Sequence, residues 1–221
     1  MPVSIIIPVL NEENSIRTTL ERLQLFRQQG NEVIVVDAGS KDQTVDIATG
    51  LVDQTLSSAK GRARQMNLGA ENAQHEILWF LHADTLVPEN AIKKIEYGLE
   101  TNAWGRFNVK LSGSRWIFRI IERMMNLRSC MTGIATGDQG IFVKQALFSG
   151  IKGYPEIPLM EDIALSKELK RLSRPACVKD QLVTSSRRWE ENGIMKTVLL
   201  MWKLRFLYFI GISADTLARQ Y

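Results

Sequence analysis

The distribution of apolar residues over positions 1–102 predicts short buried strands that alternate with amphipathic helices. The apolar runs at 3–9, 32–36 and 77–81 have strand length and fit strands buried on both faces. Further elements are expected as helices at 16–29, from about 42, at 63–73 and at 88–100, and as a short strand at 52–56. Because strands and helices that alternate at this spacing form βαβ units, this half of the chain predicts an α/β domain with a parallel sheet.

After residue 102 the pattern changes to longer helices between isolated strands. Strands are expected at 107–112, 141–143 and 178–185, and helices at 115–127, 162–171 and 194–210. The last helix is strongly apolar but contains Lys196, Lys203 and Arg205. Three internal charges argue against a helix that crosses a bilayer, so it is expected to pack on the domain or to lie in a membrane interface.

Composition places the chain among ordinary globular proteins. It has 221 residues, 45% hydrophobic and 24% charged, which excludes disordered, collagen-like and repeat proteins. Cys130 and Cys177 lack metal-site spacing and give no disulfide framework; they fit a reducing compartment, with a single bridge left open. No basic segment precedes an apolar stretch at the start, so no secretory signal is expected.

Charge is unevenly distributed. Residues 1–102 carry a net charge of −5 and residues 103–221 one of +9. A basic half suggests an anionic partner such as a phosphorylated lipid, a membrane surface or nucleic acid, and a solvated basic face is the alternative. No nucleic-acid-binding module is recognisable, so nucleic acid is not expected as a partner.

Polar residues follow the first two predicted strands. Asn11 and Glu12 follow the first, near Pro8 at its end, and Asp37 and Gly39 follow the second. In parallel sheets ligands bind beyond these strand ends, where a carboxylate can accept from a base or a ribose and a glycine lets the backbone approach the ligand. Ordinary turns with capping acids are the alternative.

Two arginines stand at the start of the helix expected at 63–73. Arg62 and Arg64 would combine their charge with the positive helix end, which suits a diphosphate; a solvated helix start is the alternative. The sequence has no GxGxxG and no Walker-type loop, so dinucleotide and P-loop sites have no support.

Acidic residues mark two further sites. Asp84, in His82-Ala83-Asp84 at a strand end, is a suitable ligand for Mg²⁺ or Mn²⁺ on a diphosphate. His82 is expected to point back into the core, and ligation of a transition metal is the alternative. Asp162 precedes a helix as an N-cap or as a general base whose pKa Glu161 would tune.

A basic aromatic segment follows the last predicted strand. Arg187, Arg188 and Trp189 suit a phosphate and the face of a sugar or base, or form a surface turn.

These segments, in this order, resemble the family-2 inverting glycosyltransferases of the GT-A fold. The resemblance covers about 3–190 and rests on Ser-Ile-Ile-Ile-Pro-Val-Leu-Asn-Glu-Glu, Val-Ile-Val-Val-Asp-Ala-Gly-Ser-Lys-Asp-Gln-Thr, Gly-Arg-Ala-Arg-Gln-Met-Asn-Leu-Gly-Ala, Trp-Phe-Leu-His-Ala-Asp-Thr and Gly-Tyr-Pro-Glu-Ile-Pro-Leu-Met-Glu-Asp. It is nearest to compact bacterial transferases with His-Ala-Asp in place of Asp-x-Asp. It implies a catalytic domain at 1–190, with a nucleotide-binding half at 1–102 and an acceptor half at 103–190, and a helical appendage at 191–221.

The resemblance also implies roles for the site residues. A nucleoside-diphosphate sugar, by default a UDP-sugar, would be the donor, and a hydroxyl compound, lipid-linked in one reading, would be the acceptor. Asp84 would hold Mn²⁺ or Mg²⁺, and Asp162 with Glu161 would deprotonate the acceptor. The implied nucleotide-binding residues are Pro8, Asn11, Glu12, Asp37, Gly39, Arg62, Arg64 and Ala83, and the implied sugar or acceptor residues are Asp138, Gln139, Arg187, Arg188 and Trp189.

Two helices raise the question of a membrane. Arg115, Arg119 and Arg123 form a basic stripe on a helix that also carries Trp116, and the apolar helix at 194–210 is basic and aromatic as well. A cytoplasmic protein in peripheral contact with anionic lipid at the inner face of the membrane is one expectation; burial and a homodimer surface are the others. Two other functions stay open: a nucleotidyltransferase of similar fold, disfavoured by the acidic first loop, and a non-catalytic nucleotide-sugar-binding domain.

Overall fold

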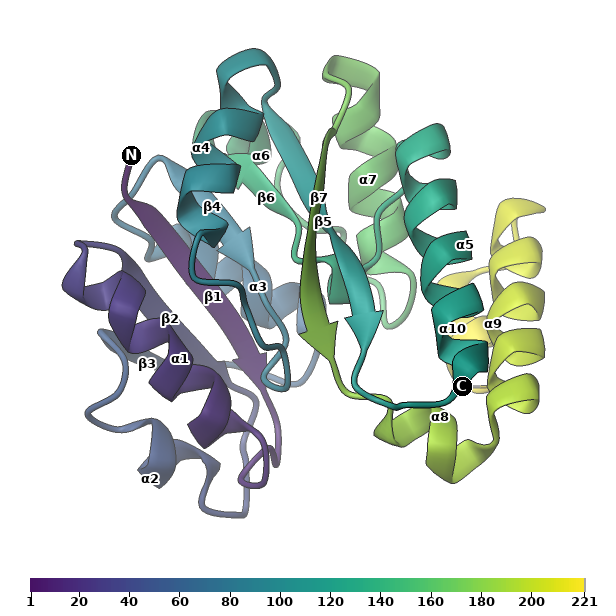
Figure 1. Cartoon of the computed structure of the whole chain (residues 1–221), viewed down its shortest axis with the longest axis horizontal. Coiled ribbons are helices and arrows are strands. Elements are labelled where there is room, and N and C mark those ends of the chain that lie inside the picture. Colours follow the sequence, from purple (N-terminus) through teal and green to yellow (C-terminus); the bar gives the residue numbers. More distant parts are fainter. Residues whose placement is uncertain (221) are drawn as a thin grey trace.

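A seven-stranded, mainly parallel sheet forms the centre of the molecule (Figure 1). The structure is a computed structural model that describes residues 1–220, apart from the side chain of Arg188. Across the sheet the strands are β3 (Gln54–Ser57), β2 (Glu32–Asp37), β1 (Val3–Val9), β4 (Ile77–Phe80), β6 (Phe142–Lys144), β5 (Trp104–Leu111) and β7 (Ala176–Thr184). Only β6 runs antiparallel to its neighbours, and the expected mixed, mainly parallel α/β sheet is therefore confirmed.

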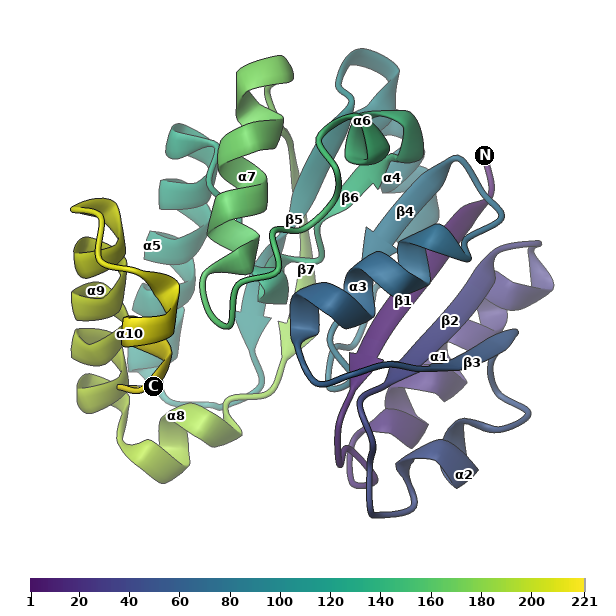
Figure 2. The ribbon, with the colours of Figure 1, turned by 180° about the vertical axis from the view of Figure 1, so that it is seen from behind.

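Helices cover both faces of the sheet because its central strands are apolar on both sides. On one face α1 (Ile16–Gln28) and α4 (Ala91–Thr101) pack against alternate strand residues such as Ile5 and Ile7. On the other, visible in Figure 2, the helices are α3 (Arg62–Glu71), α6 (Gln145–Gly150) and α7 (Glu161–Leu172). Consecutive strand residues point to opposite faces, so a run such as Ile5–Ile6–Ile7 contributes to both cores.

The parallel register brings the polar loops to one edge of the sheet. Val9 at the end of β1 pairs with Asp37 at the end of β2, and Ile6 pairs with Phe80 of β4. The loop after β4 is fastened to α1 by the Thr19 hydroxyl, which donates to the Ala83 carbonyl at 2.7 Å. The loops that follow β1, β2 and β4 therefore lie at the same edge, as the sequence predicts.

The C-terminal helices form a separate group beside β5 and β7. α5 (Trp116–Thr132) and α9 (Ile194–Phe209) lie side by side in both views (Figures 1 and 2), and α8 (Arg187–Asn192) leads into α9. α9 packs against α5 and, with α10 (Ala214–Ala218), against the start of α7. The apolar helix therefore packs on the domain along one face. Within residues 1–220, no helix combines the length and apolar character that crossing a bilayer requires.

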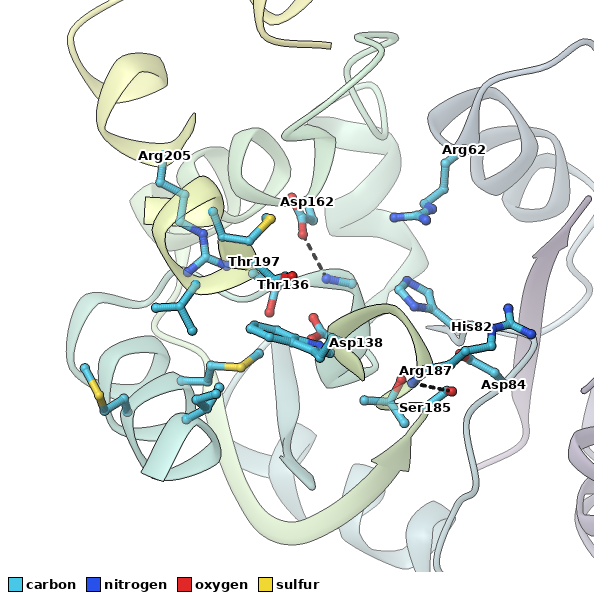
Figure 3. A pocket seen from close by; sticks show the side chains of 18 of the residues that line it. Arg62, His82, Asp84, Thr136, Asp138, Asp162, Ser185, Arg187, Thr197 and Arg205 are labelled. Atoms are coloured by element: carbon cyan, nitrogen blue, oxygen red, sulfur yellow. Dashed lines mark hydrogen bonds between the residues drawn. The ribbon is translucent and has the colours of Figure 1, made fainter. Parts of the chain in front are cut away.

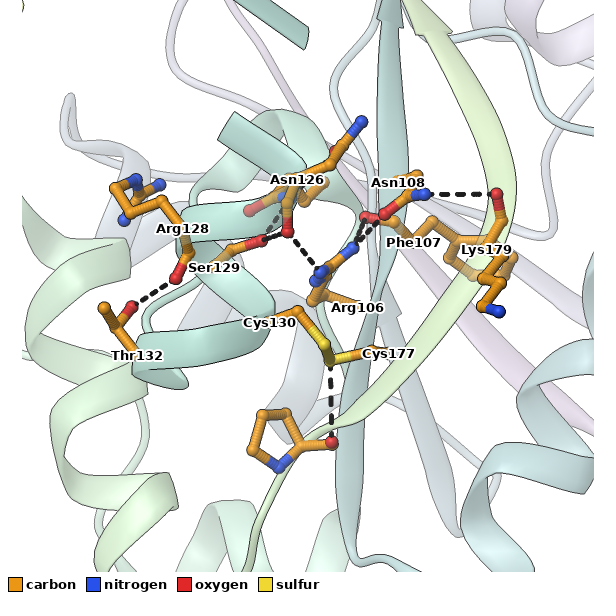
Figure 4. The surroundings of a disulfide bond; sticks show 12 residues. Arg106, Phe107, Asn108, Asn126, Arg128, Ser129, Cys130, Thr132, Cys177 and Lys179 are labelled. Carbon is orange, nitrogen blue, oxygen red and sulfur yellow. Dashed lines mark hydrogen bonds between the residues drawn. A yellow bond between two sulfur atoms is a disulfide. The ribbon is translucent and has the colours of Figure 1, made fainter. Parts of the chain in front are cut away.

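Cys130 of α5 and Cys177 of β7 form a disulfide, with their Cα atoms 5.8 Å apart (Figure 4). This is the single bridge that the sequence left open. Beside it the buried Arg106 guanidinium donates to the carbonyl oxygens of Phe107 at 3.2 Å and Asn126 at 2.8 Å. These bonds hold the middle of α5 against β5.

Most expected elements occur within a few residues of their predicted bounds. The early end of α2 (Thr44–Ala48) was not predicted, and neither were α6, α8, α10 and the short 3-10 helix η1 (Gly137–Gln139). These elements have six residues or fewer, so a helical repeat of apolar positions is too short to be recognised in them.

Candidate active site

A cavity of about 610 Å³ opens at the edge of the sheet where the strand-end loops meet. Pro8 in β1, Glu12 in the loop after β1, and Ala83 and Asp84 in the loop after β4 line it. Asp162 at the start of α7 and Gly137 and Asp138 of η1 line it as well. Figure 3 shows Asp84, Asp138 and Asp162 around one space.

The nucleotide-binding expectations divide at this cavity. Pro8, Glu12, Ala83 and Arg62 line it, whereas Asn11, Asp37, Gly39 and Arg64 do not. Of the four acidic residues that the resemblance assigns to the nucleotide, the metal ion and catalysis, Glu12, Asp84 and Asp162 line this cavity and Asp37 does not.

Residues outside the cavity are engaged in their own loops. The Asp37 carboxylate accepts from the Gly39 amide at 2.9 Å and from Ser40. The Asn11 side chain accepts from the Lys41 amide at 2.9 Å, and Arg64 pairs with Glu156 at 2.8 Å. These bonds stiffen the loops after β1 and β2, and Gly39 adopts φ +86°, which suits glycine.

His82 faces the cavity, and the expectation that it points into the core is wrong. Burial, followed by the positive charge of Arg62, lowers the pKa of His82 to about 4, so the imidazole is neutral at pH 7. Its Nε2 is buried and has no hydrogen-bond partner among the residues that the structure describes. A neutral imidazole nitrogen in this state can accept a hydrogen bond or bind a metal ion.

His82 and Asp84 are lining residues that could hold a divalent metal ion together with a bound diphosphate. Burial and the nearby Glu12 carboxylate raise the pKa of Asp84, a carboxylate that a cation would stabilise. No group of three or more His, Cys, Asp or Glu side chains with metal-site geometry occurs within the described residues. Mg²⁺ in such sites takes one or two protein carboxylates and completes its coordination shell with phosphates and water. One carboxylate and one imidazole therefore fit a site that binds metal only together with the diphosphate of the sugar donor. The imidazole nitrogen favours Mn²⁺ over Mg²⁺.

A sharp turn presents Glu161 and Asp162 at the start of α7. Met160 just before them adopts a left-handed φ of +67°, a strained conformation for a residue with a side chain. The Asp162 carboxylate accepts from the Gly137 amide at 2.9 Å and from the Ile163 amide at 2.7 Å (Figure 3). The hydrogen bonds fix its orientation toward the cavity.

Electrostatics make Asp162 a better base than an ordinary aspartate. Burial raises its pKa, although the amides of Gly137 and Ile163 counteract part of this shift. Burial and then the charge of Asp162 also raise the pKa of Glu161, whose carboxylate lies 3.5 Å from the Arg62 guanidinium. A carboxylate with a raised pKa that faces a cavity can accept a proton from a bound hydroxyl group.

The residues expected at the sugar or acceptor are only partly brought together. Asp138, Arg187 and Trp189 line the cavity, and the positive charge of Arg187 acts on the Asp84 carboxylate. Gln139 is fully buried, and its amide donates to Ser129 at 2.9 Å, so its assignment to a sugar is wrong. The side chain of Arg188 lies outside the described residues.

The remaining cavity wall was not foreseen. α5 and α9 contribute Arg128 and Arg205, two basic residues of the cavity that the sequence analysis did not assign. Apolar side chains surround them: Ile121, Met124, Met125, Val198, Met201 and Trp202. The sequence contains an indication that Arg205 faces a polar site, because a charge inside an apolar helix requires a polar partner. It contains no such indication for Arg128.

Comparison with solved structures establishes the fold type. S. aureus TarS, residues 1–349, superimposes with a TM-score of 0.68 at 20% identity, covering 84% of this chain and 61% of that one. A mannosyltransferase of Pyrobaculum calidifontis with GDP-Man and Mn²⁺ gives a TM-score of 0.64 at 20% identity, covering 82% and 56%. These structures confirm the expected GT-A fold.

Sequence comparison establishes the family. Poly-β-1,6-N-acetyl-D-glucosamine synthase of S. aureus strain MSSA476 is 24% identical over 95 residues, which are 40% of this chain and 23% of that protein. Undecaprenyl-phosphate 4-deoxy-4-formamido-L-arabinose transferase of Pseudomonas syringae pv. syringae strain B728a is 28% identical over 158 residues, covering 64% and 46%. The chain thus spans less than half the length of either relative. The model of glycosyl transferase family 2 matches residues 4–142, more than half of the chain. This chain therefore belongs to glycosyl transferase family 2.

Proposed function

We propose that the protein is an inverting glycosyltransferase that moves a sugar from a nucleoside-diphosphate sugar to a hydroxyl group. The observation that carries this proposal is that Asp162 of α7 and Asp84 of the loop after β4 line one cavity of about 610 Å³. A carboxylate that can hold a metal ion and a carboxylate that can act as a base thus share one space with a bound sugar and an attacking hydroxyl. UDP is the expected nucleotide, in line with the UDP-GlcNAc complex of TarS.

In the reaction the acceptor oxygen attacks the anomeric carbon from the side opposite the leaving diphosphate. The new C–O bond forms as the bond from this carbon to the diphosphate oxygen breaks, so the configuration inverts. Asp162 accepts the hydroxyl proton, and the Gly137 and Ile163 amides hold its carboxylate in place. Arg62 and Arg187 stabilise the negative charge that develops on the diphosphate.

His82 and Asp84 would hold the divalent metal. Neighbouring structures contain Mn²⁺ or Mg²⁺ with GDP-Man or UDP. The ion would supply Lewis-acid stabilisation of the departing diphosphate.

Substitution of the base tests this function. Asp162→Asn is expected to lower kcat by about 10²- to 10⁴-fold, because the amide cannot accept the proton. UDP binding, measured by calorimetry, should persist, since Asp162 belongs to α7 and is not one of the residues proposed to bind the nucleotide. Glu168→Gln is the matched control, because Glu168 is an exposed carboxylate on the same helix. Full turnover by Asp162→Asn would exclude Asp162 as the base, and failure of every nucleotide sugar to bind would refute the transferase.

We also propose that α5 and α9 dock on an anionic membrane surface. Apolar side chains at helical spacing are exposed on both helices: Trp116, Ile120, Met124, Leu127 and Met131 on α5, and Met195, Leu199, Trp202, Phe206 and Phe209 on α9. Exposed basic residues accompany them: Arg115, Arg123, Lys196 and Lys203. Arg119 does not belong to this set, because its guanidinium donates to the carbonyls of Leu111 and Gly113. Apolar and basic side chains together match the interface of an anionic bilayer.

Vesicle binding tests the docking surface. The protein should sediment with vesicles that contain phosphatidylglycerol at low salt, and high salt should release it. Trp116→Ala combined with Phe206→Ala should weaken binding about 10-fold or more, because two large apolar side chains are lost from the contact. Tyr97→Ala on α4 is the control, an equally exposed aromatic residue elsewhere. Absence of vesicle binding together with a concentration-dependent dimer would refute the proposal and assign the surface to a second copy.

A further inference from the structure

Two guanidinium groups that the proposed reaction does not use line the cavity. Arg128 comes from α5 and Arg205 from α9, 77 positions later in the chain. Arg128 donates through Nη1 to the Ile134 carbonyl at 3.2 Å. Its Nε and Nη2, and Nε of Arg205, are buried without a hydrogen-bond partner among the described residues. Buried charged donors of this kind are costly unless an acceptor binds them.

The two arginines are close enough to repel each other. The pKa of Arg128 falls to about 10, chiefly through burial and next through the positive charge of Arg205. Asp138 and Asp162 counteract this shift in part, yet neither forms an ion pair with either arginine within the described part of the chain. Adjacent like charges in a partly buried wall create a positive potential that favours an anion between them.

Arg205 lies apart from the residues that are proposed to bind the donor diphosphate. In Figure 3, Arg205 lies on one side of Asp162, whereas Arg62, His82 and Asp84 lie on the other. In this view Asp162, the proposed base, therefore stands between the proposed metal-binding residues and Arg205, whose positive charge also acts on Arg128. A group bound by Arg128 and Arg205 would belong to the acceptor, whose hydroxyl faces Asp162.

We propose that Arg128 and Arg205 bind a phosphate group carried by the acceptor. This inference rests on the proposed transferase function and names the chemical class of its acceptor. Two guanidinium charges match the charge of a phosphate monoester, and guanidinium groups bind phosphate oxygens through paired N–H donors. The phosphate could belong to a lipid headgroup or to a water-soluble compound, and the surrounding Met125, Met201 and Trp202 leave both sources chemically compatible.

The test measures phosphate binding to the protein saturated with UDP and Mn²⁺, so that the donor side is filled. Inorganic phosphate and dodecyl phosphate below its micellar concentration serve as probes, and binding is followed by the rise in melting temperature. Both probes should bind the wild type without displacing UDP. Arg128→Gln and Arg205→Gln should each weaken binding about 10-fold or more, whereas Arg128→Lys and Arg205→Lys should retain part of it because they keep the charge.

Arg123→Gln on α5 and Lys203→Gln on α9 are the matched controls. Both are exposed basic residues on the same helices, outside the cavity lining. Unchanged UDP binding by the Gln variants at 128 and 205 shows that they are folded. Equal binding of the two probes supports a soluble acceptor, and tighter binding of dodecyl phosphate that Trp202→Ala abolishes supports a lipid acceptor.

Three outcomes would overturn the inference: no binding of either probe, equal binding to all variants, or displacement of UDP by phosphate. Failure of the transferase itself has a different signature. In that case no nucleotide sugar is turned over, although phosphate still binds at the two arginines.

Discussion

Gly137 sits directly beneath the imidazole of His82 and offers a sharp test of the site geometry. A Cβ atom at position 137 would lie 2.6 Å from His82 Nε2, closer than any normal contact. The backbone of Gly137 is not in the left-handed region, so alanine is compatible with its conformation. Gly137→Ala therefore acts on His82 rather than on the backbone of η1.

The size of the effect follows from this distance. To restore an ordinary contact of 3.4 Å, the imidazole must retreat by roughly 0.8 Å. Displacement of a reacting or metal-binding group by about 1 Å commonly costs about 100-fold in rate. The amide of residue 137 also holds Asp162, so a shift of η1 would disturb the base as well. We expect kcat/KM to fall about 100-fold, with a small change in melting temperature.

The assay compares initial rates of sugar transfer for Gly137→Ala, two other single variants and one double variant. Gly150→Ala is the matched control, because a Cβ there meets nothing within 4 Å, and its rate should be unchanged. In His82→Ala the space above residue 137 is free, so adding Gly137→Ala to this variant should cost little. An equal rate for Gly137→Ala and the wild type would refute the reasoning, as would full additivity in the double variant.

Three further predictions concern the same molecule. Replacing Cys130 and Cys177 by serine removes a link across 47 positions and should lower the free energy of unfolding by about 4 kcal/mol, measured by urea denaturation. An unchanged midpoint of the urea-induced unfolding transition would mean that the disulfide does not stabilise the protein. Because Asp162 acts in its ionised form and burial raises its pKa, kcat/KM should fall as the pH is lowered through a value above the usual 3.8 of aspartate, and a flat profile down to pH 4 would contradict this. Mn²⁺ should raise the melting temperature of the UDP complex in the wild type but not in Asp84→Asn, and the same rise in Asp84→Asn would exclude Asp84 as the ligand. His82→Ala should reduce the preference for Mn²⁺ over Mg²⁺.

Hydrophobic patterning was sufficient for the parallel strands of the first half and for the edge that carries the site. All residues of β1 except Ser4 are apolar, which requires burial on two faces and hence helices on both sides. Parallel strands end at one edge, so the positions of Glu12 and Asp84 near this edge followed from the order of elements. The antiparallel β6 did not follow in the same way, because a strand of three residues has no direction that a sequence pattern could reveal.

Only the tertiary structure decided which of these side chains face one cavity. Asp37 and Glu12 follow neighbouring strands, yet the Asp37 carboxylate is bound within its own turn and Glu12 lines the cavity. The direction of a side chain in a loop depends on local turns and on contacts from distant elements, as His82 over Gly137 shows.

Contacts between distant elements also explain the two arginines and the disulfide, which the sequence did not predict. Arg128 and Arg205 meet because α9 packs against α5, and Cys130 reaches Cys177 because α5 lies along the strand pair β5 and β7. Such contacts join residues that are tens of positions apart, and a single sequence carries no periodic signal for them. Local periodicity therefore determined the elements and their order, whereas packing between distant elements determined the chemistry of the cavity.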